Sequence, residues 1–433
     1  MRLQKLIYQA IIWRGLYYAS VFALNIIIAR MFKAHGSGLV NYFITNLSFL
    51  LLITSLSLES ALGYFASRKD ISISKLTGIG LVLAIVSALL SSALFMLFFG
   101  QQAGAWFDSP YIISFIYVLG VVLTNYFGSL YYAHNRPVLP NIILLVINVL
   151  VAVSIADAYV NHYDPEVEDL MLQVYMASFL VQGLLIFIAW SAGQGRAFLN
   201  IQLPARHEMK QLLNYAFAAL MANVIFFLVY RVDYWFVESF CTPEALGNYI
   251  QVSKLGQIFL LLPSIIATAV FTRTAGGNQD HIRSVIEIIS RWLLFFYIVF
   301  VAVILVTGKW LFPLVYGHSF DQMYAPFVLL TPGILSLSTL SLLTAFYAGR
   351  NKMGINIRGS MIAFIVIVAG DFLLIPRYGI MAAALVSSIG YICFQVYVLR
   401  EFRKEYRSDL MAFFIPKWSD WDKVKQYIRA EAN

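Results

Sequence analysis

The sequence predicts an all-α integral membrane protein with 12 transmembrane helices in two parallel six-helix repeats around a central cleft. The prediction rests on composition, on the length of the apolar runs and on motifs shared by the two halves. Hydrophobic residues make up 61% of the 433 residues, charged residues only 12%, and the mean hydropathy is +0.77. Soluble domains average roughly 45–50% apolar and about 25% charged residues. This composition therefore excludes soluble, disordered and disulfide-stapled proteins.

The apolar runs have the length of membrane-spanning helices, because roughly 20 helical residues cross a hydrocarbon core about 30 Å thick. Twelve such runs are predicted, at residues 6–29, 40–65, 76–99, 110–132, 140–160, 168–190, 210–237, 246–271, 286–307, 323–347, 356–375 and 379–400. They lack the strict alternation of transmembrane β-strands. The first run is too long for the apolar part of a signal peptide, so we expect it to remain in the protein.

The positions of the cations predict the orientation. Of the 30 Lys and Arg residues, 23 fall on the same side as the N-terminus, four fall on the other side and three lie inside spans. Cytoplasmic loops carry the excess of Lys and Arg, so both termini are predicted to be cytoplasmic. The net charge of +8 is thereby explained as a topology signal, and we expect no nucleic-acid partner.

The chain is predicted to have three parts. Residues 1–195 form an N-lobe with spans one to six, residues 196–400 form a C-lobe with spans seven to twelve, and residues 401–433 form a cytoplasmic tail. Trp418, Trp421 and nearby cations in the tail predict a helix lying on the membrane surface, with partner docking as the alternative. No connection between spans is long enough for a soluble catalytic domain.

Two pairs of motifs suggest an internal repeat. Residues 38–42 (GLVNY) follow the first span, and residues 246–249 (LGNY) follow the seventh. Residues 131–136 (YYAHNR) end the fourth span, and residues 346–351 (FYAGRN) end the tenth. Each half begins inside and crosses six times, so the halves are predicted to be parallel repeats related by an axis along the membrane normal.

Three motifs in the second half carry a resemblance to a known family. They are residues 233–237 (DYWFV) with 244–249 (EALGNY), residues 314–320 (LVYGHSF), and residues 374–380 (LIPRYGI) followed by 382–385 (AAAL). The chain resembles bacterial polysaccharide flippases, including O-antigen flippases, of the multidrug/oligosaccharidyl-lipid/polysaccharide exporter superfamily. It departs from that pattern at Met381, where the family usually has Gly.

This resemblance implies a transporter of the bacterial inner membrane that serves surface polysaccharide and lipopolysaccharide biosynthesis. It would flip polyprenyl-pyrophosphate-linked oligosaccharide from the cytoplasmic to the outer leaflet by alternating access. Its partners would be the lipid-linked oligosaccharide, membrane lipids and, as candidates, polysaccharide assembly proteins. The relatives commonly have a cationic central cavity, which suits a pyrophosphate.

Charged residues inside the spans are the candidate functional residues, because a charge at the bilayer centre costs at least about 2.5–3.5 kcal/mol. Six are predicted there: Arg14, Glu59, Arg231, Asp233, Lys254 and Asp371. Counting from the predicted turns places Arg14 and Glu59 in the cytoplasmic half, at similar depth, so that they could pair. The same counting places the other four in the outer half.

We assign substrate binding to the three cations. Arg14 is expected to receive the pyrophosphate on the cytoplasmic side, and Arg231 and Lys254 are expected to attract it in the outward-facing state. Glu59, Asp233 and Asp371 are expected to be counter-ions, or proton or sodium sites if transport is ion-coupled. The alternative for all six is a structural role, as helix-joining ion pairs or snorkelling groups.

The remaining residues favour a transporter over an enzyme. Cys241 and Cys393 lie far apart, and all six His fall in loops or at span ends, so neither a metal site nor a catalytic residue at membrane depth is predicted. We expect no cofactor and no enzymatic activity. A multidrug or organic-cation exporter of the same superfamily is the nearer alternative, and a membrane-embedded glycan-modifying enzyme is the more distant one.

Overall fold

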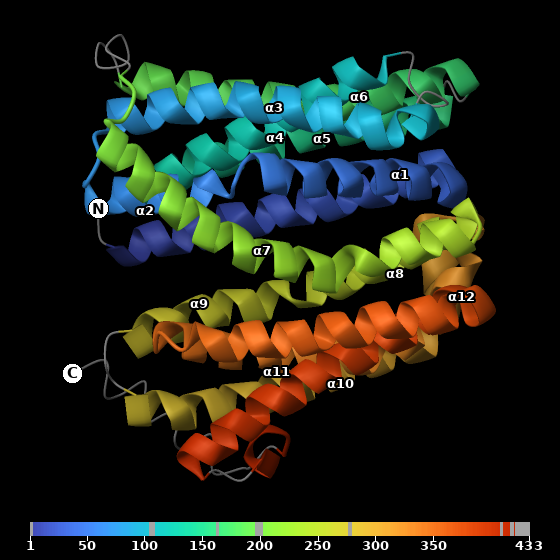
Figure 1. Cartoon of the computed structure of the whole chain (residues 1–433). Helices are drawn as coiled ribbons and strands as arrows, with labels where there is room; N and C mark the ends of the chain where they lie inside the picture. The colour runs from blue at the N-terminus through green and yellow to red at the C-terminus, as the bar shows by residue number, and fades with distance from the viewer. Residues whose placement is uncertain are drawn as a thin grey trace. The chain divides into compact units, whose positions relative to one another are not determined.

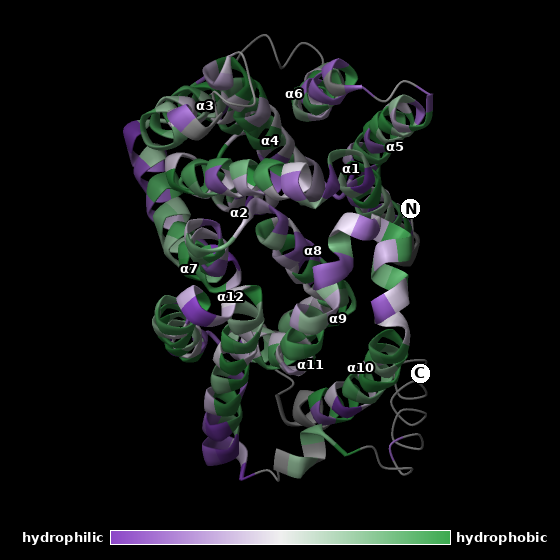
Figure 2. Cartoon of the chain, turned by 90° about the vertical axis from the view of Figure 1, so that its right-hand side faces the viewer, coloured by the Kyte–Doolittle hydropathy of each residue, from purple (hydrophilic) through white to green (hydrophobic). Residues whose placement is uncertain are grey.

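The structure is a computed structural model that describes residues 3–103, 109–161, 164–194, 202–275, 279–407, 410–415 and 420. Within these ranges all regular secondary structure is helical (Figure 1). Ten helical segments of the described chain are long and apolar enough to cross a membrane. Figure 2 shows that hydrophobic residues dominate the long helices. The all-helical membrane architecture expected from the composition is therefore confirmed.

The elements follow one another along the chain with short connections. They are α1 (Leu3–Thr54), α2 (Leu58–Arg68), α3 (Ile73–Ala103), α4 (Pro110–Ala133), α5 (Val138–Asn161), α6 (Pro165–Gln194), α7 (Arg206–Phe240), α8 (Pro243–Phe259), α9 (Leu261–Ala275), α10 (Gln279–Tyr316), the 3-10 helix η2 (His318–Met323), α11 (Tyr324–Gly349), α12 (Met353–Tyr406) and the 3-10 helix η3 (Leu410–Phe413).

Two helices are far longer than one membrane crossing. Helix α1 has 52 residues and α12 has 54, and at 1.5 Å per residue each would extend about 80 Å if straight. Each contains one residue with non-helical backbone angles, Lys33 (φ 54°) in α1 and Gly379 (φ 57°) in α12. These residues lie where turns were predicted between spans one and two and between spans eleven and twelve. Each long helix therefore consists of two arms joined at a kink.

Two predicted spans are interrupted by breaks. The predicted span 40–65 is broken between Thr54 and Leu58, where Leu56 and Ser57 have positive φ. The span 246–271 is broken between α8 and α9. Pro263 has no N–H to donate to the carbonyl of Phe259, and the Tyr297 hydroxyl donates to that oxygen instead. A side chain from another helix thus satisfies the carbonyl that proline leaves open.

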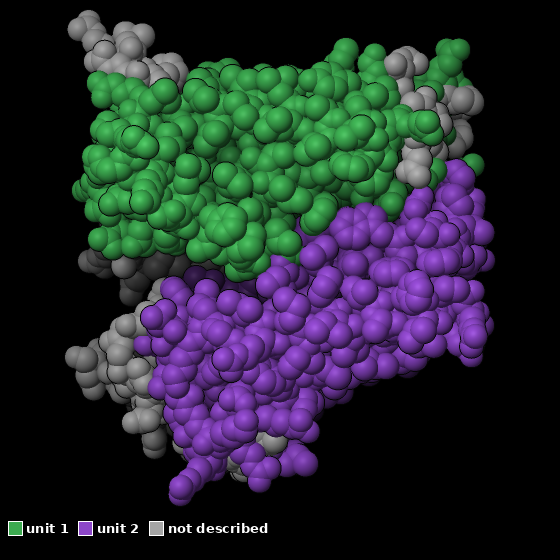
Figure 3. All heavy atoms as spheres, viewed as in Figure 1, with its two compact units in different colours: residues 1–33, 39–224 green, residues 34–38, 225–433 purple. Residues whose placement is uncertain are grey.

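The chain divides into two compact units, which Figure 3 colours separately. Unit 1 consists of Met1–Lys33 and Leu39–Val224, and unit 2 consists of Ala34–Gly38 and Ile225–Asn433. In unit 1, α4 packs against α2, α3 and α6, and α5 packs against α6 (Figure 1). In unit 2, α11 contacts α8, α9, α10 and α12. The predicted lobe boundary at residues 195–196 lies outside the described residues. Apart from residues 34–38 of α1, which belong to unit 2, the chain passes from unit 1 to unit 2 within α7.

Ion pairs join helices at the ends that the sequence assigns to the cytoplasm. Lys75 of α3 and Glu208 of α7 lie 2.9 Å apart, within unit 1. In unit 2, Arg291 of α10 pairs with Asp420 of the tail at 3.3 Å, and both side chains are buried. Asp420 is the described part of the predicted surface helix, whose Trp418 and Trp421 lie outside the described residues.

The paired motifs at the ends of α4 and α11 form the same backbone cap. Asn135 and Asn351 both have positive φ, at 56° and 58°. In α4 the Arg136 N–H donates to the Tyr131 carbonyl at 2.9 Å, and the Lys352 N–H makes the equivalent bond to Tyr347 at 2.9 Å. These bonds satisfy carbonyls that a helix end otherwise leaves open. Superimposing the two caps requires a shift along the sequence that is one residue longer than the shift that aligns the letters of the two motifs.

The glycines of the other motif pair permit a close backbone contact within unit 2. A Cβ placed on Gly247 of α8 would lie 1.9 Å from the carbonyl oxygen of Ala34, and one on Gly38 would lie 2.7 Å from the Gly247 nitrogen. The Ala34 N–H donates to the Ser319 hydroxyl at 3.0 Å, and the His35 ring and the Glu244 carboxylate lie 2.8 Å apart. Residues 34–38 are therefore held on α8 and η2 by contacts that exclude larger side chains.

We predict that Gly247→Ala destabilises the protein by at least about 1–3 kcal/mol, because the added methyl group forces backbone atoms apart. The measurement is the melting temperature of the purified chain in detergent. Gly128→Ala is the matched control, since a Cβ at Gly128 meets no atom within 4 Å. Equal melting of the Gly247→Ala variant and the wild type would contradict this account of the contact.

Candidate functional site

Arg14 lies on α1 in unit 1 and is surrounded by tyrosines. It is exposed, its Nη2 donates to the Tyr18 hydroxyl at 3.3 Å, and its guanidinium carbon lies 5.7 Å from the ring centroids of Tyr18 and Tyr132. The Tyr132 hydroxyl accepts a hydrogen bond from Asn141 at 2.9 Å. Among the described residues Arg14 has no ion pair. It thus presents a cation next to aromatic rings, an arrangement that can bind an anion attached to a sugar.

Glu59 is half-buried in the first turn of α2, also in unit 1. The described contacts contain no ion pair between Glu59 and Arg14, and Glu59 instead interacts electrostatically with buried Tyr126. A separate polar chain crosses the same unit: Gln182 donates to Asn148 at 2.9 Å, and Asn148 donates to Ser20 at 3.3 Å. The structure therefore does not join the two charges that the sequence placed at similar depth.

In unit 2, Asp233 of α7 is held by two hydroxyl groups. Its Oδ2 accepts hydrogen bonds from Tyr249 of α8 and, at 3.1 Å, from Ser387 of α12. Asp233 is 1% exposed and Tyr249 is fully buried. Three helices thus meet at one buried carboxylate, which the two hydroxyl donors stabilise.

Asp371 of α12 lies near Asp233 and lacks such donors. It is 0% exposed, and neither of its carboxylate oxygens has a hydrogen-bond partner among the described residues. It interacts electrostatically with Asp233 and with Tyr249. Two buried carboxylates of like charge cannot both remain ionised without a neutralising cation. The pair is chemically suited to hold a proton or a small cation.

Arg231 and Lys254 extend the same neighbourhood in unit 2. Both are half-buried, and each interacts electrostatically with the other; Arg231 also interacts with Asp233. The guanidinium carbon of Arg231 lies 5.6 Å from the ring centroid of Phe227 and 5.9 Å from that of Tyr234. Four of the six charged residues are therefore gathered in unit 2, whereas Arg14 and Glu59 lie in unit 1.

The hydroxyl groups that support these charges are not among the six residues predicted from the sequence. Tyr249 stands in the EALGNY motif, so a signal was present, but that motif predicted an internal repeat and a family resemblance rather than a hydrogen-bond donor. Ser387 has no local signal, because it acquires its role from a buried carboxylate on another helix. Tyr18 lies one turn after Arg14 on α1, and Tyr132 stands in the YYAHNR motif, so a signal was present for both tyrosines. No group of three or more His, Cys, Asp or Glu side chains in the described part of the chain could hold a metal ion.

Comparison with known proteins relates this chain to transporters by fold. No family model matches the sequence, and no curated protein matches it. Among solved structures, the inward-facing conformation of a multidrug resistance MATE family transporter of the MOP superfamily is similar with a TM-score of 0.70, at 11% identity, over 92% of this chain and 98% of the other. The lipid II flippase MurJ in an inward closed conformation gives a TM-score of 0.66 at 14% identity, over 93% and 89%.

A third solved structure indicates the same fold. The Vibrio cholerae MATE transporter VcmN in its bent form is similar with a TM-score of 0.60 at 15% identity, over 95% of this chain and 99% of the other. The chain therefore has the fold of MOP superfamily transporters. The neighbours include both a lipid flippase and multidrug exporters, so the fold is shared by proteins with different substrates.

We predict that Tyr249→Phe destabilises the protein by about 1.5–3 kcal/mol, because the buried Asp233 carboxylate loses one of its two hydroxyl donors. The melting temperature in detergent is the measurement. Tyr111→Phe is the control, since Tyr111 is exposed and belongs to unit 1.

A double-mutant cycle separates this hydrogen bond from simple loss of packing. In an Asp233→Asn background, Tyr249→Phe is expected to cost less than in the wild type, because the charge that the hydroxyl stabilises is gone. Equal costs in the two backgrounds would contradict the assigned role of Tyr249.

Proposed function

We propose that this chain flips polyprenyl-pyrophosphate-linked oligosaccharide from the cytoplasmic to the outer leaflet of the bacterial inner membrane, by alternating access. The observation that carries the proposal is Arg14, an exposed cation within an apolar segment that has no ion pair in the described chain. A cation at that position is costly unless an anion visits it. A pyrophosphate satisfies it through charge-assisted hydrogen bonds.

The aromatic residues around Arg14 support a glycan-bearing substrate. Tyr18 and Tyr132 present rings and hydroxyl groups next to the guanidinium. Such groups can stack on sugar rings and hydrogen-bond to them, and the positive charge of Arg14 between them would repel an organic cation. The likeness to a lipid II flippase also agrees with a lipid-linked substrate.

We further propose 12 membrane crossings with both termini in the cytoplasm. Ten segments are suited to crossing, and two of them, Ile12–Thr54 and Met353–Tyr406, contain a kink and are long enough to cross twice. The excess of Lys and Arg on one side supports the orientation. In this scheme spans one to six form the N-lobe and spans seven to twelve form the C-lobe.

The buried carboxylates of unit 2 are proposed as the coupling site. Asp371 has no hydrogen-bond donor among the described residues and lies near Asp233, so a proton or a sodium ion at Asp371 would remove the repulsion between the two carboxylates. Arg231 and Lys254 are proposed to attract the pyrophosphate during the outward-facing state, and the interaction of Arg231 with Asp233 would link the bound cation to the substrate. Glu59 would serve as a counter-ion in unit 1.

The second candidate function is export of organic cations, favoured by the likeness to multidrug exporters. An organic cation needs an acidic group that it can reach. Asp233 and Asp371 are 1% and 0% exposed, which favours a bare ion at these carboxylates over a drug molecule. Deletion in the native cell separates the two functions: inner-leaflet accumulation of lipid-linked oligosaccharide supports the flippase, and dye sensitivity with unchanged surface glycan supports the exporter.

We predict that Arg14→Ala and Lys254→Ala each lower glycan export by about tenfold or more, since each removes a charge-assisted contact worth roughly 1.5–3 kcal/mol. Surface glycan is quantified in a deletion strain complemented with each variant, at matched membrane levels. Arg403→Ala, at an exposed cation near the end of α12, is expected to export normally. Wild-type export by both the Arg14→Ala and the Lys254→Ala variants would reject the proposed substrate contacts.

Asp371→Asn is predicted to abolish coupling, because a neutral amide leaves no charge for the driving cation to neutralise. In proteoliposomes, wild-type flipping should respond to an imposed proton or sodium gradient, and the variant should lose that response and slow by about tenfold or more. Asp70→Asn is the control, since Asp70 is an exposed partner of Arg68. A variant that keeps the full gradient response would place coupling elsewhere.

A further inference from the structure

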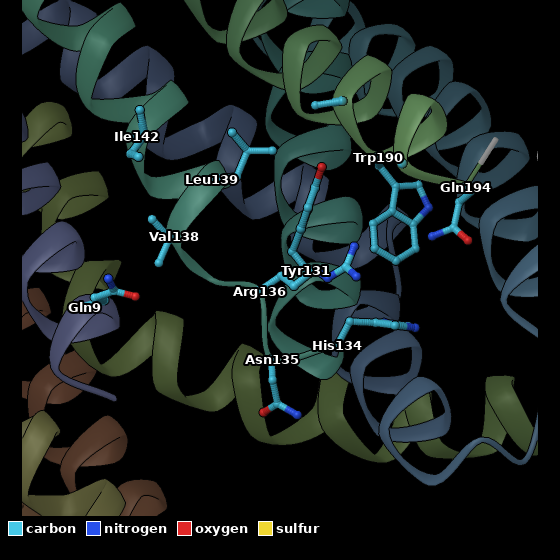
Figure 4. A pocket seen from close by; sticks show the side chains of 12 residues that line it. Gln9, Tyr131, His134, Asn135, Arg136, Val138, Leu139, Ile142, Trp190 and Gln194 are labelled. Atoms are coloured by element: carbon cyan, nitrogen blue, oxygen red, sulfur yellow. The ribbon is translucent and has the colours of Figure 1, made fainter. Parts of the chain in front are cut away.

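Unit 1 contains a cavity that none of the six charged residues lines. It encloses about 470 Å³ where the end of α4, the start of α5 and the end of α6 come together, with Gln9 of α1 at its side (Figure 4). This volume falls in the range of about 300–1,000 Å³ that small-molecule sites occupy. The cavity is large enough to be a binding site in its own right.

The polar part of the lining is cationic. Arg136, His134 and Asn135 come from the turn between α4 and α5, and the 12 lining residues include no Asp or Glu. In Figure 4 the Arg136 side chain extends between Val138 on one side and Trp190 on the other. The Nδ1 of His134 must donate to the Leu130 carbonyl, 2.9 Å away, so Nε2 of the neutral ring is an acceptor and the positive charge of the lining comes from Arg136. The cavity is thus complementary in charge to an anion.

The rest of the lining is apolar and firmly held. Leu139 and Ile142 of α5 line one side, and Trp190 of α6 lines the other. Trp190 is 3% exposed, donates from Nε1 to Thr77 at 3.1 Å and packs edge-on to Tyr131 at 5.1 Å. Leu139 is 43% exposed, so the apolar side of the cavity is open to the surroundings of the unit. These walls suit a hydrocarbon chain.

The backbone around the cavity adds to the attraction of an anion. The cap at Asn135 occupies the last carbonyls of α4, which reduces their negative potential at the cavity. Helix α5 begins at Val138, a lining residue, and the N-terminal end of a helix carries a partial positive charge. Arg136 and the start of α5 therefore act in the same direction.

We propose that this cavity binds a phosphate-headed lipid, with its phosphate at Arg136 and a hydrocarbon chain between Leu139, Ile142 and Trp190. A free phosphate would not use the apolar walls, and an uncharged lipid would not use the cation. The cavity lies at the end of unit 1 that the charge distribution assigns to the cytoplasm, where basic pockets between helices bind anionic headgroups. Anionic phospholipids and polyprenyl phosphates share the required chemistry.

The test is native mass spectrometry of the full chain, purified in detergent and offered phosphatidylglycerol, polyprenyl phosphate or diacylglycerol. We expect retention of a phosphate-headed lipid and little retention of diacylglycerol. Preferred retention of phosphatidylglycerol would identify a membrane phospholipid as the ligand, and preferred retention of polyprenyl phosphate would identify a carrier lipid. Equal retention of diacylglycerol, or no retention of any of the three, would overturn the proposal.

Two variants locate the bound lipid. A Cβ at Gly193 meets no atom within 4 Å, so Gly193→Leu can fill the cavity without displacing the fold, and it should weaken retention about tenfold. Arg136→Gln removes the charge from an exposed side chain and should weaken lipid retention by a similar factor. Gly354→Leu, equally free of contacts but outside the cavity, should retain lipid normally. Wild-type retention by both cavity variants would overturn the assignment.

Discussion

Hydrocarbon supplies neither hydrogen-bond donors nor counter-ions, so every polar group that enters it must find a partner in the protein. This constraint accounts for the exclusively helical secondary structure of the described chain, since helices satisfy their own backbone. It also accounts for the side-chain hydrogen bonds that satisfy polar groups inside the apolar helices. The Phe259 carbonyl, which Pro263 cannot reach with an N–H, accepts from Tyr297, and Asp233 accepts from Tyr249 and Ser387. Each of these hydrogen bonds joins helices that are separate in the sequence.

The two units meet this constraint in different ways. Unit 1 leaves Arg14 exposed among tyrosines, with its positive charge unpaired within the described residues. Unit 2 buries Asp233 and Asp371 near each other and places Arg231 and Lys254 in the same neighbourhood. Charge in unit 1 is therefore suited to a visiting anion, and charge in unit 2 is suited to a small cation. This division is the physical basis for proposing that unit 1 receives the substrate at Arg14, and that unit 2 holds the coupling site next to the cations that attract the substrate in the outward-facing state.

Helix positions were predictable where one physical variable decides them. The apolar runs located the spans, since length and hydropathy alone determine whether a segment can cross a bilayer. The breaks at residues 55–57 and at Leu260 were missed, because helix continuity there depends on φ angles and on a carbonyl partner rather than on hydropathy. The GLVNY and LGNY motifs were visible in the sequence. The need for glycine in them comes from a close backbone contact between Gly247 and Ala34, which the periodicity of hydrophobic residues does not reveal.

The sequence by itself determined that the chain is a helical membrane protein, which ends carry the cations, and which six charged residues need an explanation. Composition and span length are sufficient for these conclusions because they depend on the cost of transfer into hydrocarbon, which each segment meets separately. Only the tertiary structure decided that Asp233 and Asp371 are neighbours, that Arg14 and Glu59 form no described ion pair, and that a cationic cavity lies beside Trp190. Those relations depend on which helix faces pack together, and averaging hydropathy along the chain removes that information.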